Sequence, residues 1–202
     1  MVKALELSEL ELDLLTELFN LGVGNAANSL STMVKQEIEL SVPEILFLKQ
    51  HELASKIGHQ NSICSVSQNM SGPFTAQTML LFPEDNSLEV VRQLLGSELP
   101  DDTLLELQKE ALSEIGNIVL NACINSFSNA IKEEFKVELP GYELSNPADL
   151  FNRSADEEAT ALFIRISMKL RKSHISCYMA FLMGELSLQH LKKVLEKTIS
   201  NL

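Results

Sequence analysis

An internal repeat is the feature that most constrains the fold. A shift of 97 residues aligns residues 7–43 with residues 104–140, and about a third of the aligned positions are identical. The polar identities include Glu9/Glu106, Glu17/Glu114, Asn20/Asn117, Asn28/Asn125, Ser29/Ser126, Ser31/Ser128, Lys35/Lys132 and Glu37/Glu134. Polar matches in a single register indicate duplication. We therefore expect two related halves, about 1–98 and 99–202, within one domain spanning 1–202, because segment 97–102 is too short for independent movement.

Each half begins with the signals of a long helix. Ser8 is followed three residues later by Glu11, and Thr103 by Glu106, so both starts match a capping box. From these starts to about residues 34 and 131 the chain has no proline and keeps apolar residues three or four apart. The pattern predicts two helices of six or seven turns.

The rest of each half predicts strands and a shorter helix. An extended stretch containing Pro43 or Pro140 follows the long helix, then strands at about 62–68 and 75–82, or 160–168 and 175–182, and a closing helix from Ser87 or Ser187. Segment 142–158 is acidic and is expected to be a solvated loop without a counterpart in the first half. The fold class is α/β of the α+β type: a pseudo-twofold, duplicated domain with two long helices on a shared, largely antiparallel sheet.

Composition excludes several classes of function. Twenty-eight acidic against sixteen basic residues give a net charge of −12, which argues against a nucleic-acid surface. No apolar run is long enough to span a bilayer and no secretory signal is present, so we expect a cytoplasmic protein without membrane insertion. Three widely spaced cysteines and four scattered histidines show no ligand spacing, so no metal site is predicted.

A polar stripe follows one face of each long helix. On the first helix it contains Asp13, Glu17, Asn20 and Gly24, and on the second Glu110, Glu114, Asn117 and Asn121. A surface stripe is usually only solvated, but the same stripe in register on two helices favours a function. A Glu and an Asn three residues apart can bind a cation and orient a water molecule. Neither is a strong nucleophile, so the electrophile must come from a partner.

These stripes carry a resemblance to a known family. Asp13-x-x-x-Glu17-x-x-Asn20 is followed after twenty-two residues by Pro43, and the second half repeats the pattern from Glu110 to Pro140. This motif resembles the signature of the CheC, CheX and FliY phosphatases, and two copies without a switch-protein domain resemble the CheC type. The second copy departs from the usual Asp or Ser at its first position, where it has Glu110.

The resemblance implies a phosphatase that acts on the aspartyl phosphate of a CheY-type response regulator. It implies that Glu17 and Glu114 engage a lysine of the receiver, while Asn20 and Asn117 orient the attacking water. Asp13, Gly24, Pro43, Glu110, Asn121 and Pro140 would support or bind. The receiver would supply magnesium, and this chain would need no cofactor of its own. CheC-type proteins also bind the deamidase CheD, but no residue pattern of this chain locates such a site.

Two other interpretations remain open at this point. The same helix faces could belong to a non-catalytic adaptor that binds a receiver, CheD or a flagellar switch component. Alternatively, the chain could be an unrelated scaffold whose polar stripes are surface only. Because both copies lie in one chain, the pseudo-dimer is already covalent, and we expect a monomer. The sequence does not identify the cognate receiver.

Overall fold

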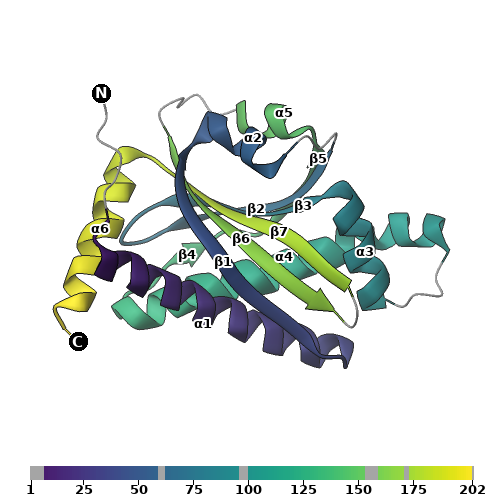
Figure 1. Ribbon diagram of the computed structural model, residues 1–202, viewed down its shortest axis with the longest axis horizontal. Helices are drawn as coiled ribbons and strands as arrows, with labels where there is room; N and C mark the ends of the chain where they lie inside the picture. Colours follow the sequence, from purple (N-terminus) through teal and green to yellow (C-terminus); the bar gives the residue numbers. More distant parts are fainter. Residues whose placement is uncertain (1–6, 59–61, 96–99, 153–158, 171–172, 202) are drawn as a thin grey trace.

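The computed structural model describes residues 7–58, 62–95, 100–152, 159–170 and 173–201 (Figure 1). The first half contains α1 (Glu9–Val34), β1 (Ile38–Lys49), the 3-10 turn η1 (Gln50–Glu52), α2 (Leu53–Ile57), β2 (Ile63–Ser71), β3 (Ala76–Pro83) and α3 (Glu84–Leu95). The second half contains α4 (Asp101–Ile131), β4 (Lys136–Val137), β5 (Gly141–Ser145), α5 (Pro147–Asn152), β6 (Thr160–Leu170), β7 (Ser173–Met183) and α6 (Glu185–Ile199).

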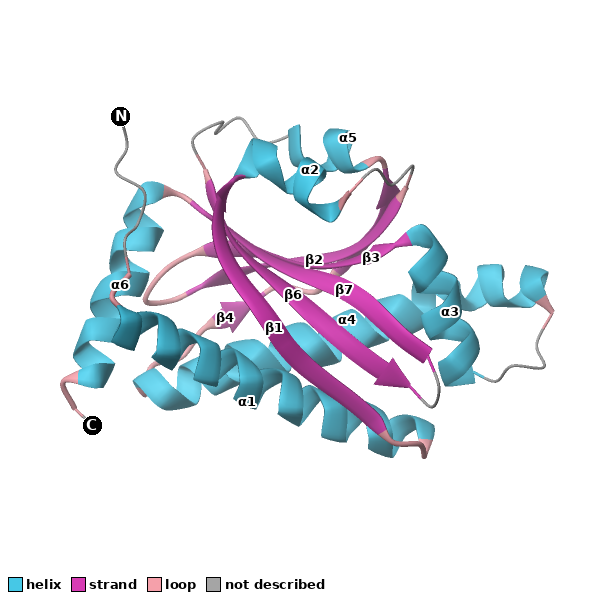
Figure 2. Cartoon of the chain, viewed as in Figure 1, coloured by secondary structure: helices cyan, strands magenta, loops and turns pink. Residues whose placement is uncertain are grey.

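Strands of both halves form one sheet (Figure 2). Its seven strands follow the order β1-β6-β7-β3-β2-β4, and β5 pairs with β2 beside β4. Every strand pairing is antiparallel. From one end the order is β1, β6, β7, and from the other end the corresponding strands of the opposite half follow as β4 with β5, β2, β3. Because β3 and β7 pair at the centre, the two halves are related by a pseudo-twofold axis. The predicted fold class, with two long helices on a shared antiparallel sheet, is confirmed.

Helices cover both faces of the sheet. The long helices α1 and α4 pack against each other on one face and run in opposite directions (Figure 1). Together with α3 and α6 they form the larger core, in which Leu15, Leu112 and Leu195 are fully buried. On the other face α2 and α5 pack around a smaller core that contains Leu53, Phe151 and Phe163. The long helices are thereby fixed on their sheet-facing sides and expose the opposite sides.

The two long helices begin differently. At α1 the predicted capping box is confirmed, because the Ser8 hydroxyl accepts from the Glu11 N–H at 3.3 Å and the Ser8 N–H donates to Glu11 Oε2 at 2.7 Å. At α4 the predicted box at Thr103 is wrong. The N-cap lies three residues earlier, at Pro100, which provides no side-chain cap, and the helix begins at Asp101. The carboxylates of Asp101 and Asp102 lie in its first turn, where they complement the helix dipole.

This difference predicts unequal effects of two alanine substitutions. Ser8→Ala removes an N-cap hydrogen bond and should lower the free energy of unfolding by about 1 kcal/mol. Thr103→Ala lies inside the helix and should change it by less than about 0.5 kcal/mol. Urea denaturation followed by circular dichroism measures both values. Equal losses at the two positions would show that the Ser8 cap does not stabilise α1.

The segment predicted to be an acidic loop is largely regular structure. Residues 141–145 form β5 and residues 147–152 form α5, whereas 153–158, with Asp156, Glu157 and Glu158, lie outside the described residues. The segment also has a counterpart, because η1 and α2 occupy the matching place in the first half and α2 packs against α5. The closing helices α3 and α6 begin slightly before the predicted Ser87 and Ser187.

Strand pairing refines the register of the repeat. The shift of 97 residues places α1 on α4 and β1 on β4 and β5. On β2 the residues that face the long helices are even-numbered, such as Cys64 and Val66, and on β6 they are again even-numbered, such as Leu162 and Ile164. An odd shift would reverse these faces. The exact value comes from the pairing, because Ile45 and Tyr142, which are 97 apart, pair with Ile164 and Val66, which are 98 apart. The second half therefore has one more residue than the first before β6, and Gln68 corresponds to Ile166.

Candidate functional site

The first predicted pair lies on the solvent side of α1. Glu17 and Asn20 are both exposed and belong to adjacent turns, with Asp13 exposed one turn before them. Within the part of the chain that the structure describes, no hydrogen bond or ion pair involves these three side chains. Gly24, one turn further, is half-buried, and a Cβ built there meets nothing within 4 Å. The surface beside Asn20 is therefore open.

The second predicted pair lies at the corresponding place on α4. Glu114 and Glu110 are exposed, but Asn117 is half-buried and its amide is hydrogen bonded. Asn121 Nδ2 donates to Asn117 Oδ1 at 2.6 Å, and Gln68 Nε2 of β2 donates to Asn121 Oδ1 at 3.2 Å. Sequence reasoning missed Gln68. The signal was a polar residue at an inward-facing position of a strand whose neighbouring inward residues are apolar.

Both pairs are held by rigid elements. Opposite the stripe of α1, Leu15 and Leu18 are buried, and the Phe19 ring lies 5.3 Å from Phe127 of α4 and 5.4 Å from Phe181 of β7. The two helices approach closely at Gly22, where an added Cβ would lie 2.7 Å from the Cα of Cys123. A residue without a side chain is therefore needed at this point of α1. Side chains on packed helices are positioned more accurately than side chains on loops.

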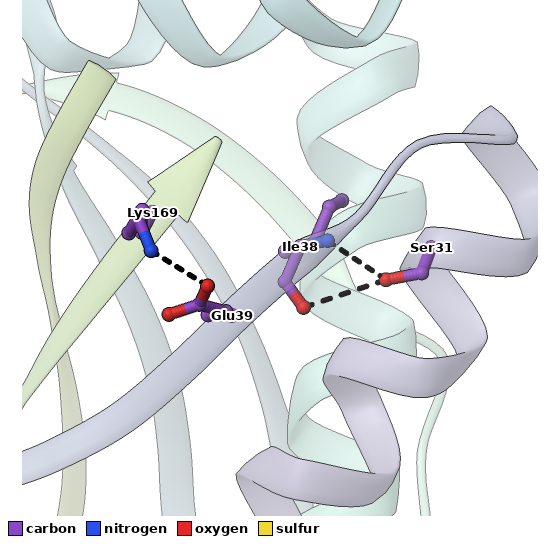
Figure 3. A network of polar contacts seen from close by, with 4 residues as sticks. All are labelled: Ser31, Ile38, Glu39 and Lys169. Carbon is purple, nitrogen blue, oxygen red and sulfur yellow. Dashed lines mark hydrogen bonds and ion pairs between the residues drawn. The ribbon is translucent and has the colours of Figure 1, made fainter. Parts of the chain in front are cut away.

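Repeated residues in and just after the last turns of the two long helices have structural roles. The Ser31 hydroxyl accepts from the Ile38 N–H at 2.9 Å and joins the end of α1 to β1 (Figure 3). In the second half Ser128 Oγ donates to the Glu133 carbonyl at 2.6 Å. Lys35 and Lys132 terminate the helices in the left-handed region, with φ of 54° and 57°. The identities Ser31/Ser128 and Lys35/Lys132 in the two halves are therefore explained by the way both helices end.

The two motif prolines lie on neither helix. Pro43 is part of the edge strand β1, where the register shifts between Ser41 and Glu44, and Pro140 separates β4 from β5. Proline lacks a backbone N–H and is tolerated at such interruptions of an edge strand. The place of both prolines at the edge of the sheet gives their spacing from the Asn residues a structural reason.

The chemical groups on these faces are carboxylates and amides. Among the described residues no three His, Cys, Asp or Glu side chains gather as a metal-binding group.

All three cysteines are free and buried, and burial raises the pKa of Cys123 and of Cys177 to about 12, so both thiols are protonated at neutral pH. No described helix has the length and apolarity to cross a membrane. The faces can bind a cation and orient water, but they contain no activated nucleophile.

Comparison with known proteins confirms the predicted resemblance to the CheC, CheX and FliY group. The model of the CheC-like family matches residues 10–46, which include the whole first motif. The CheY-P phosphatase CheC of Bacillus subtilis (strain 168) is 24% identical over 144 residues, 68% of each chain. The flagellar motor switch phosphatase FliY of the same organism is 20% identical over 170 residues, 82% of this chain and 44% of FliY. This chain thus spans less than half of FliY.

Solved structures share the fold at low identity. FliY of Thermotoga maritima matches with a TM-score of 0.74 and 18% identity over 98% of this chain and 100% of that one. FliM in the FliM–SpeE complex from H. pylori matches with a TM-score of 0.70 and 12% identity, over 98% of this chain and 100% of that one. A CheX–CheY–BeF3–Mg complex from Borrelia burgdorferi matches with a TM-score of 0.53 and 18% identity, over 83% of this chain and 97% of that one. The shared fold therefore extends over nearly the whole chain.

Proposed function

We propose that this chain is a phosphatase that hydrolyses the aspartyl phosphate of a CheY-type response regulator. The observation that supports it most is the presence of two Glu–Asn pairs, Glu17 with Asn20 and Glu114 with Asn117, at corresponding places on α1 and α4. Relatives named CheY-P phosphatases support the same class of reaction. A surface used only for binding would not require an amide at the same position of both helices.

In the proposed reaction this chain binds the receiver and orients water. The carboxylates of Glu17 and Glu114 pair with a lysine of the receiver and set the position of each helix over its phosphorylated aspartate. Each Asn amide has an NH2 group that can donate to a phosphoryl oxygen, and an oxygen that can accept from the attacking water. The receiver supplies the phosphoryl group and its magnesium ion. Orientation and charge placement account for most of the catalysis in phosphoryl transfer.

The direct test mixes the full chain with a phosphorylated receiver domain and magnesium and follows the phosphoprotein with time. A phosphatase shortens the lifetime of the phosphoprotein and turns over many receivers per chain. A stable complex whose phosphate is lost no faster than from the receiver alone would instead support the adaptor. The observation that supports this second candidate is that solved structures with this fold include complexes of FliM with SpeE and with FliG. No binding in any phosphorylation state would overturn both.

The carboxylates should contribute mainly to binding. Glu17→Gln combined with Glu114→Gln keeps the side-chain shape but removes both charges, so affinity for a BeF3-activated receiver should fall roughly tenfold at low salt. Glu9→Gln combined with Glu106→Gln is the matched control, because these residues are also exposed and also repeat-related, but lie outside the motif. Fluorescence anisotropy measures both affinities. Equal losses for the two double variants would assign the effect to net charge alone.

A further inference from the structure

A line of three amides connects the sheet to the second site. Gln68 lies on β2 and is only 3% exposed, and its Nε2 donates to Asn121. The neighbouring backbone is also fixed, because Thr78 Oγ1 of β3 donates to the Gln68 carbonyl at 3.1 Å. Asn121 in turn donates to Asn117. Asn117, the half-buried end of this line, is therefore attached to the centre of the fold through two hydrogen bonds.

The line has a direction, which determines how Asn117 is oriented. The Gln68 Oε1 atom is buried without a partner, whereas its NH2 group is used. The observed direction leaves Oε1 and one N–H of Gln68 unpaired, whereas the reverse direction would leave both N–H groups unpaired in the same buried place. The reverse is costlier, because a buried nitrogen without any acceptor is rarer in proteins than a buried oxygen without a donor. With the observed direction Asn117 Oδ1 points toward Asn121. Its NH2 group is then turned away from Asn121, and one lone pair of Oδ1 remains.

The first site has no such line. Gly24 occupies the place of Asn121, and the residue of β6 that corresponds to Gln68 is Ile166, which is fully buried. Among the described residues nothing hydrogen bonds to the Asn20 amide. The two halves therefore provide an internal comparison between an amide that is held and one that is free to rotate.

We propose that Asn121, held by Gln68, is a positioning residue that fixes the Asn117 amide in one of its two orientations. This inference rests on the proposed function and deepens it. The fixed amide presents its NH2 group to a phosphoryl oxygen and its remaining Oδ1 lone pair to the water. A freely rotating amide has this arrangement for only part of the time, so the line raises the catalytic rate of the second site without adding a contact to the receiver.

Asn121→Asp separates this role from a merely structural one. The new carboxylate has nearly the same shape and can still accept from Gln68, but it cannot donate to Asn117, so the Asn117 amide turns its NH2 group inward. In an Asn20→Ala background, which retains only the second site, kcat should fall roughly tenfold with KM nearly unchanged. In an Asn117→Ala background, which retains only the first site, the same substitution should leave kcat unchanged. Asn129→Asp, an exposed position of α4 outside the stripe, is the control for charge.

A second measurement does not depend on activity. Gln68→Leu does not touch Asn117, yet it should move the side-chain amide resonance of Asn117 in a nitrogen–proton NMR spectrum and leave that of Asn20 in place. An unmoved Asn117 resonance, or an unchanged kcat for Asn121→Asp in the second-site background, would overturn the proposal. If the wild-type chain hydrolyses nothing, the proposed function fails, while the spectrum still decides whether Gln68 and Asn121 orient Asn117.

Discussion

Asn20→Ala combined with Asn117→Ala should reduce the rate of receiver dephosphorylation by about 100-fold or more, to nearly the spontaneous rate of the receiver. Each substitution removes the amide that orients the water and donates to the phosphoryl group, and the methyl group of alanine can do neither. Either single variant should keep a substantial part of the activity, because the other site remains intact. The measurement is phosphate release under multiple turnover with magnesium in excess.

Asn25→Ala combined with Asn129→Ala is the control for the double variant. Both residues are exposed on α1 and α4, outside the proposed pairs, so this control should retain the wild-type rate. Binding of a BeF3-activated receiver should also persist in the Asn20/Asn117 double variant, because both Glu residues remain. If that variant dephosphorylates the receiver as fast as wild type, the proposed roles of the two amides are wrong.

Gly22→Ala should destabilise the fold by roughly 1–3 kcal/mol, although alanine is the better helix former. The new Cβ would lie 2.7 Å from the Cα of Cys123 and 3.0 Å from its sulfur. A backbone atom cannot rotate aside, so α1 and α4 must separate, and this disturbs the packing of Phe19 against Phe127. Urea denaturation of the purified variant measures the change in the free energy of unfolding.

Gly24→Ala provides the matched comparison two residues further along the same helix. A Cβ at Gly24 meets no atom within 4 Å, so only the helix propensity changes, and the free energy of unfolding should rise by about 0.5–1 kcal/mol. The two substitutions are chemically identical and should have opposite signs. If both stabilise the protein, the close approach of α1 to α4 at Gly22 is not a rigid contact.

The large elements could be predicted well from the sequence, because each helix and strand pattern occurs once in each half of the chain. The long helices ended at residues 34 and 131 as expected, since their apolar periodicity is long and contains no proline. The short helices α2 and α5 were missed, because five or six residues are too few to show a helical period. The capping box at Thr103 was wrong because the same residue spacing also occurs inside a helix, where Pro100 and two acidic residues already define the start.

The residues of the candidate site that lie together on one helix could be predicted from the sequence, and the residue contributed by a strand could not. Glu and Asn on the same helix face follow from helical geometry alone, so both pairs emerged from spacing, and their catalytic roles stay predictions. The contribution of Gln68 depends on which strand lies beneath α4 and which face of that strand points toward it. Neither fact is contained in local spacing. A buried glutamine in an otherwise apolar row was the only sign.

The contact between Gly22 and Cys123 also means that the two halves are no longer interchangeable. In a homodimer of identical halves, one residue type would have to serve on both sides of the axis. By the repeat, Gly22 corresponds to Val119, and an extra side chain at that point would collide with the facing helix. Two copies of the second half could therefore not pair as the present halves do. Because the two copies are joined in one chain, the glycine is needed on one side of the axis only. The two halves can therefore differ in sequence, and each helix face can take on a role of its own.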